Sequence, residues 1–185
     1  MTVWVFTVGC TLLLFWGVGV HQRVLFLRQQ AVQAFGQVSL LLAQRSESWR
    51  IRAEALAGVP GGHDLAERCR AADQHLQAAV ALARVQRHDA VSLRTVALAL
   101  RSARTVADAV LADALGTLND ADHAAWRQAE QSLDFALDHF NREALAHQQA
   151  CQRWPTRLVV VLSRHASLPT LPTWGEALPA GRGGA

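Results

Sequence analysis

The stretch from Asp120 to Pro155 constrains the fold most, because its apolar residues recur at alternating steps of three and four. This heptad spacing is typical of one long helix with a single buried stripe. A lone helix cannot bury such a stripe, so other helices of the chain must cover it. The stripe consists of Trp126, Ala129, Leu133, Ala136, Leu137, Phe140, Ala144, His147, Cys151 and Trp154.

The composition favours an all-α protein and argues against several classes of function. Tyr is absent, and runs of β-branched residues are scarce outside residues 1–20 and 159–161. The net charge is +3, and the arginines alternate with Asp and Glu instead of forming a basic stripe, so no nucleic-acid partner is expected. Cys10, Cys69 and Cys151 lack the close spacing of a disulfide framework or a zinc site.

Residues 2–20 contain no charged side chain and predict a transmembrane helix in contact with the lipid bilayer. At ~1.5 Å per residue, a helix of this length matches a hydrocarbon core of ~30 Å. Trp4 and Trp16 stand toward its two ends, as interfacial aromatic residues do. A cleaved signal peptide would carry a basic residue before the apolar run, and a lipoprotein would not continue its apolar run past Cys10. We therefore interpret the stretch as a retained anchor.

Basic residues such as Arg23 and Arg28 follow this anchor, and none precedes it. The positive-inside rule then places the N-terminus outside and the rest of the chain in the cytoplasm. We therefore expect a single-pass protein of the inner (cytoplasmic) membrane. The opposite orientation would make the chain a periplasm-facing four-helix bundle that senses a small ligand.

Apolar residues continue at helical spacing beyond the anchor, and no proline occurs before Pro60. One continuous helix is therefore expected to leave the membrane and to end at the glycines near Gly58. Three more helices with short links follow, so the whole is predicted to be an antiparallel four-helix bundle. The second helix is expected to begin with a capping box at Asp64 and to end near Arg87. The third should begin at Asp89 or Ser92 and end just before Gly116, and the fourth should run from Asn119 or Asp120 to Pro155.

The chain thus divides into an anchor (1–22), a helical bundle (23–165) and an irregular Pro/Gly-rich tail (166–185). Because the last helix is antiparallel to the first, its end should lie near the membrane surface from which the first helix emerges. The short apolar patch that follows Pro155 is therefore expected at the membrane surface. Candidate membrane or partner contacts in this part of the chain are Leu158, Val160, Leu162 and Trp174.

Two sets of residues match motifs of a known family. The last helix contains Glu130, His139-Phe140-Asn141, His147-Gln148 and Trp154-Pro155, followed by Leu158. The first helix contains His21-Gln22, Leu27-Arg28, Ala34-Phe35 and Gln37-Val38, with Arg45 at a frequently basic position. In this spacing the chain resembles a divergent member of the LemA family of bacterial membrane proteins. It differs in two Tyr-Asn pairs, which are His-Gln here, and in an Ile-Pro-Asn-Leu motif, whose place is taken by Trp49–Arg52.

The resemblance implies a membrane-anchored cytoplasmic bundle with no assigned catalytic activity, in an accessory or scaffolding role beside another membrane protein or complex. Glu130 and Asn141 are either solvated or, as we favour, hydrogen-bonded across the bundle to Gln22, Gln37 or Arg28. The structural polar and motif residues that the resemblance singles out are Arg28, Gln37, Glu130, Asn141 and Pro155.

One group of side chains on the last helix has the spacing of metal ligands. His139, Glu143, His147 and Cys151 recur every four residues. A carboxylate-bridged site in a bundle needs an inward Glu-x-x-His on a second helix, and none is present, so no metal or other cofactor is expected. The chain also lacks a phosphate-binding loop, a nucleophile elbow and a His-Glu-x-x-His motif. We therefore predict a non-enzymatic protein without a small-molecule substrate, which binds another membrane protein.

Overall fold

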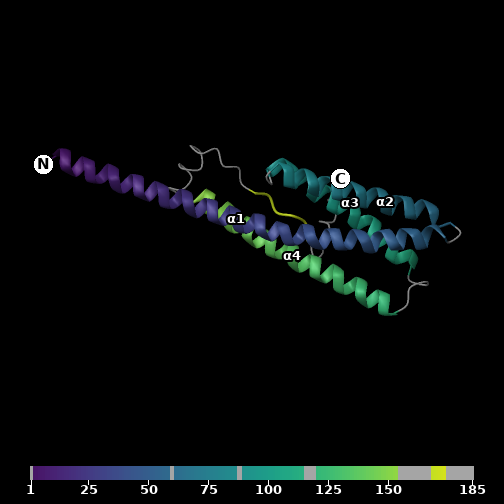
Figure 1. The fold of residues 1–185 in the computed structure, drawn as a ribbon. Helices are drawn as coiled ribbons and strands as arrows, with labels where there is room; N and C mark the ends of the chain where they lie inside the picture. The colour runs from purple at the N-terminus through teal and green to yellow at the C-terminus, as the bar shows by residue number, and fades with distance from the viewer. Residues whose placement is uncertain (1, 59–60, 87–88, 115–119, 154–167, 174–185) are drawn as a thin grey trace, which may run out of the picture.

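The computed structural model describes residues 2–58, 61–86, 89–114, 120–153 and 168–173, and these ranges contain helices and turns but no strand (Figure 1). The prediction of an all-α protein is confirmed over this part of the chain. The helices are α1 (Thr2–Ala57), α2 (His63–Val85), α3 (Ala90–Ala114) and α4 (Asp120–Gln152).

Helix α1 is continuous over 56 residues, as the absence of a proline predicts. It ends where the Gly58 amide donates a hydrogen bond to the Ala55 carbonyl over 3.2 Å. Gly61 in the following turn has a φ of 85°, a conformation that favours glycine. The turn glycines therefore end the helix and reverse the chain.

The starts of α2 and α3 differ in how they are capped. The capping box predicted at Asp64 was wrong, because Gly62 is the N-cap of α2 and no side chain caps it. The Gly62 carbonyl already accepts the first helical hydrogen bond, from the Ala66 amide over 2.9 Å. At α3 the Asp89 carboxylate accepts a 2.8 Å hydrogen bond from the Ser92 amide, which is the predicted Asp89 cap.

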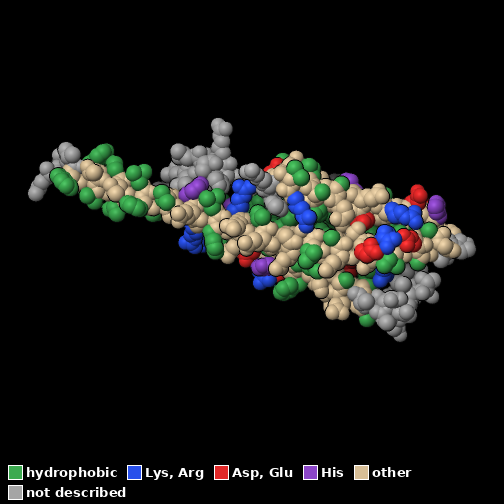
Figure 2. All heavy atoms as spheres, viewed as in Figure 1, with side chains coloured by type: hydrophobic (Ala, Val, Ile, Leu, Met, Phe, Trp, Pro, Cys, Tyr) green, Lys and Arg blue, Asp and Glu red, His purple; other side chains and the backbone are tan. Residues whose placement is uncertain are grey.

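The two parts of α1 have different surroundings. Large apolar side chains along residues 4–18 are exposed, and this part extends beyond the other described helices (Figures 1 and 2). It makes α1 long and apolar enough to cross a membrane. From Val24 to Ala53 one stripe of α1 is buried in the core instead. We call the described residues from Arg23 onward the helical body.

Within the helical body α1 packs against both α4 and α2, and α2 packs against α3. The rings of Phe35 and Phe140 meet edge to face at 5.7 Å, and those of Trp49 and Trp126 stack at 6.1 Å. The later residue of α1 thus meets the earlier residue of α4, so these two helices are antiparallel. Over the described residues α3 and α4 have no Cα atoms within 8 Å of each other.

Several sequence-based predictions fall outside the described residues. Helix α4 ends at Gln152, before the predicted limit at Pro155, and the apolar patch beyond it lies outside the described residues, as does most of the tail. Their proximity to the membrane and their contacts stay predictions. The residues concerned are Trp154, Pro155, Leu158, Val160, Leu162 and Trp174.

Candidate functional site

The first candidate site is a buried ion pair that joins α1 to α4. Arg45 Nε donates a 2.7 Å hydrogen bond to Glu130 Oε1, and the two side chains are only 7% and 19% exposed. The Arg45 guanidinium lies 4.6 Å from the centre of the Trp49 ring and 6.0 Å from that of Trp126. The stacked indoles thus provide cation–π contacts beside the ion pair, and we call these four residues the Arg45–Glu130 site.

Burial acts against both charges of this site. It lowers the pKa of Arg45 and raises the pKa of Glu130, and the attraction between the two side chains opposes both shifts. Asp73 and Asp108 add negative potential that also favours the charged guanidinium. The site is therefore a desolvated charge pair whose members depend on each other.

A cleft opens on the α2 side of the same region of α1. Its volume is about 300 Å³, and its lining includes Trp49 and Asp73 together with the exposed Arg50. Ser46 donates a hydrogen bond to Asp73 across the cleft and ties α1 to α2. The Trp49 indole Nε1 is buried and has no hydrogen-bond acceptor among the described atoms.

The second candidate site binds residues 168–173 of the tail. Asn141 Nδ2 donates to the Leu171 carbonyl, and Asn141 Oδ1 accepts from the Leu171 amide, both over 2.7 Å. Gln148 donates to the Leu168 carbonyl, and Arg104 of α3 donates to the Thr173 carbonyl over 2.9 Å. We call Asn141, Gln148 and Arg104 the tail-binding site.

The tail also contributes to the core through its side chains. Leu168 and Leu171 are each only 2% exposed, and both belong to the same apolar cluster as the helices. The tail is therefore irregular here, but it is packed and hydrogen-bonded to both α3 and α4. Because no Cα atoms of those two helices lie within 8 Å of each other over the described residues, this segment links them through its own contacts.

The hydrogen-bond partners predicted for Glu130 and Asn141 were wrong. Both side chains are bonded to distant segments, but neither bonds to Gln22, Gln37 or Arg28. Gln22 and Gln37 are exposed on α1, and Arg28 is partly exposed. The register of α1 on α4 places Arg45 opposite Glu130, and sequence spacing on a single helix does not reveal that register.

The four regularly spaced candidate metal ligands of α4 do not form a cluster. His147 and Cys151 are buried, with 3.7 Å between His147 Nε2 and Cys151 Sγ, whereas His139 and Glu143 are partly exposed. No group of three or more His, Cys, Asp or Glu side chains among the described residues is placed to hold a metal ion. Burial raises the pKa of the Cys151 thiol, which favours its protonated form.

Comparison with known proteins gives no match. No protein-family model matches the chain, and no curated protein or solved structure is similar to it.

Proposed function

We propose that the chain is a non-enzymatic accessory or scaffolding protein that is anchored in a membrane and binds another membrane protein or complex. The observation that carries this proposal is the continuity of α1. The same helix contributes the exposed apolar segment of residues 4–18 and the buried stripe of the helical body, without a break between them. An uninterrupted helix would hold the body at a fixed height above the bilayer, as a scaffold requires.

The proposed topology is a single pass with the N-terminus outside and an antiparallel four-helix bundle in the cytoplasm. Basic side chains begin only where the exposed apolar segment ends, which is visible along α1 in Figure 2. The positive-inside rule supports this orientation. The LemA resemblance points to the same arrangement and stays a prediction.

The orientation is tested by labelling a cysteine at the first residue of α2, next to the turn that follows α1. Cys69 is buried and unsuitable, whereas the His63 side chain is 76% exposed. In intact spheroplasts, a membrane-impermeant maleimide should leave His63→Cys unlabelled until the membrane is permeabilised. Labelling before permeabilisation would instead support the periplasm-facing alternative.

Exposed apolar side chains at the α2–α3 end of the body provide a surface for the partner. Val85 is 80% exposed and Val91 is 68% exposed, and Leu82 and Leu98 extend the apolar surface. Arg84 near this end of α2 bonds to Ser39 of α1, whereas the start of α2 follows the far end of α1. The apolar α2–α3 end is thus on the side of the body that faces the proposed membrane, where a membrane partner is within reach.

Photo-crosslinking in native membranes tests the partner proposal. A photoreactive residue at Val85 should give one discrete crosslinked species, and Val91→Asp should abolish it. Ile51 is a matched control because it is 55% exposed but lies on α1, away from the α2–α3 end. Equal crosslinking from both positions, or a free monomer after extraction in several mild detergents, would contradict the proposal.

A further inference from the structure

A groove lies between α1 and the end of α4, just beyond the exposed apolar segment of α1. Its volume is about 390 Å³. In Figure 1 the end of α4 lies against α1 close to the point where α1 extends alone. The residues that give the groove its chemical character are Trp16, Val20, Arg23, Leu27, Gln149 and Arg153.

The two ends of this groove differ in polarity. Trp16 and Val20 continue the apolar surface of residues 4–18 into the groove. Arg23 follows Val20 by three residues, or ~5 Å along the helix axis, which is the depth of the headgroups if the apolar segment spans the bilayer. The groove therefore passes from an acyl-chain environment to a headgroup environment.

Among the described residues, no carboxylate neutralises the positive charge of the groove. Arg23 and Arg153 are exposed, no acidic residue lines the groove, and neither guanidinium has a carboxylate partner among the described residues. Arg50, Arg68 and Arg142 elsewhere on the surface do pair with carboxylates. Two guanidinium groups without a described carboxylate partner, one from α1 and one from the residue that follows α4, form a site for an anion.

We propose that this groove binds one anionic phospholipid of the surrounding bilayer. The lipid phosphate lies between Arg23 and Arg153, where the Gln149 amide is a further donor, and an acyl chain lies along Trp16 and Val20. A zwitterionic lipid carries a compensating cation that the two arginines repel, so the site selects for net negative charge. The inference rests on the proposed membrane anchoring.

Lipid retention by the full-length protein in nanodiscs tests this inference. Native mass spectrometry of protein released from mixed phosphatidylglycerol and phosphatidylcholine discs should show one retained phosphatidylglycerol. Since both arginines attract an anionic headgroup, Arg23→Gln with Arg153→Gln should lower that retention by about tenfold or more. Both side chains are exposed, so folding should be unaffected, which circular dichroism checks.

The control variant combines Arg94→Gln with Arg101→Gln, two exposed arginines of α3 outside the groove, and it should retain the lipid as the wild type does. Equal retention of both lipids by membrane-inserted protein would overturn the inference and leave the proposed function intact. Displacement of the lipid by millimolar inorganic phosphate would also overturn it, since the site would then be a simple anion site. Extraction of the wild type from membranes by alkaline carbonate would reject both proposals.

Discussion

The Arg45–Glu130 site and the tail-binding site both attach a distant segment to α4, but they do so with different chemistry. The first pairs two charged side chains whose exposed fractions are 7% and 19%. The second pairs a neutral amide, that of Asn141, with the backbone of Leu171. A charge pair requires a particular side chain at both positions. An amide bonded to backbone requires only that the partner segment follow the right path, whatever its side chain.

This difference affects how each site responds to substitution. Removing one member of a buried charge pair leaves the other charge desolvated without its partner, which costs more than the pair itself contributes. Removing the amide leaves a peptide group that water can solvate once the tail moves away. The charge pair should therefore affect the whole helical body, and the amide contact should affect the tail alone.

The largest expected effect comes from Glu130→Ala. It leaves the Arg45 guanidinium buried beside Trp49, and we expect a loss of about 3 kcal/mol in the free energy of unfolding. Asp73 and Asp108 compensate only in part. Chemical unfolding of the full chain in detergent, followed by tryptophan fluorescence, measures the loss.

The matched control for Glu130→Ala replaces both charges by apolar residues of similar size, Arg45→Met with Glu130→Leu. This double variant should unfold close to the wild type, because no unpaired buried charge remains. If the single and double variants were equally destabilised, packing around the two side chains, and not charge, would explain the site.

A smaller and more local effect is expected from Asn141→Ala. It removes two hydrogen bonds to Leu171, which together typically contribute about 1–2 kcal/mol to the free energy that holds a segment in place. Hydrogen exchange at Leu171 should accelerate while the amides of α1 and α4 keep their protection. Gln131→Ala, an exposed change on the same helix, should alter neither. Unchanged exchange at Leu171 would show that the leucine side chains alone hold the tail.

The sequence predicted the helices and the two important polar residues of α4, but it did not predict the hydrogen-bond partners of those residues. The heptad stripe predicted α4, the absence of proline predicted one long α1, and the family motifs drew attention to Glu130 and Asn141. The partners were missed because each depends on tertiary register: Arg45 lies 85 residues from Glu130 in the chain. The Leu171 partner is backbone, which has no sequence signature, so the Pro-rich composition of the tail predicted only an irregular segment.

The pH dependence of stability distinguishes the charged site from the neutral one. Burial raises the pKa of Glu130 above its ordinary value of 4.5, so the folded protein keeps this proton at a pH where the unfolded chain has lost it. The resulting stabilisation is complete below pH 4.5 and is lost as the pH rises through the folded pKa.

Stability measured against pH for the wild type and Glu130→Gln tests this effect. The wild type should lose stability relative to the variant as the pH rises above 4.5, and the difference should then level off. Asn141→Ala should show the wild-type pH dependence, because it removes no titrating group. A wild type that gained stability relative to Glu130→Gln over this range would show that attraction to Arg45 outweighs burial.

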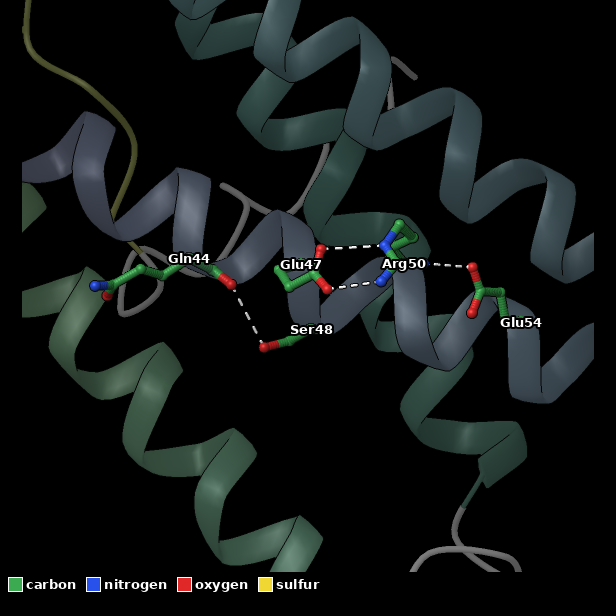
Figure 3. A network of polar contacts seen from close by, with 5 residues as sticks. All are labelled: Gln44, Glu47, Ser48, Arg50 and Glu54. Carbon is green, nitrogen blue, oxygen red and sulfur yellow. Dashed lines mark hydrogen bonds and ion pairs between the residues drawn. The ribbon is translucent and has the colours of Figure 1, made fainter.

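The smallest effect is expected at a charged cluster that resembles the Arg45–Glu130 site in bond length alone. Arg50 bonds to Glu47 and Glu54 with contacts of 2.7 Å, the same as the Arg45–Glu130 distance (Figure 3). These side chains are 56–61% exposed, so water and salt screen them. Arg50→Ala should therefore leave the unfolding midpoint unchanged, whereas Glu130→Ala lowers it. If Arg50→Ala were as damaging, burial would not be what separates the two ion pairs, and the distinction between the charged and neutral sites of α4 would lose its physical basis.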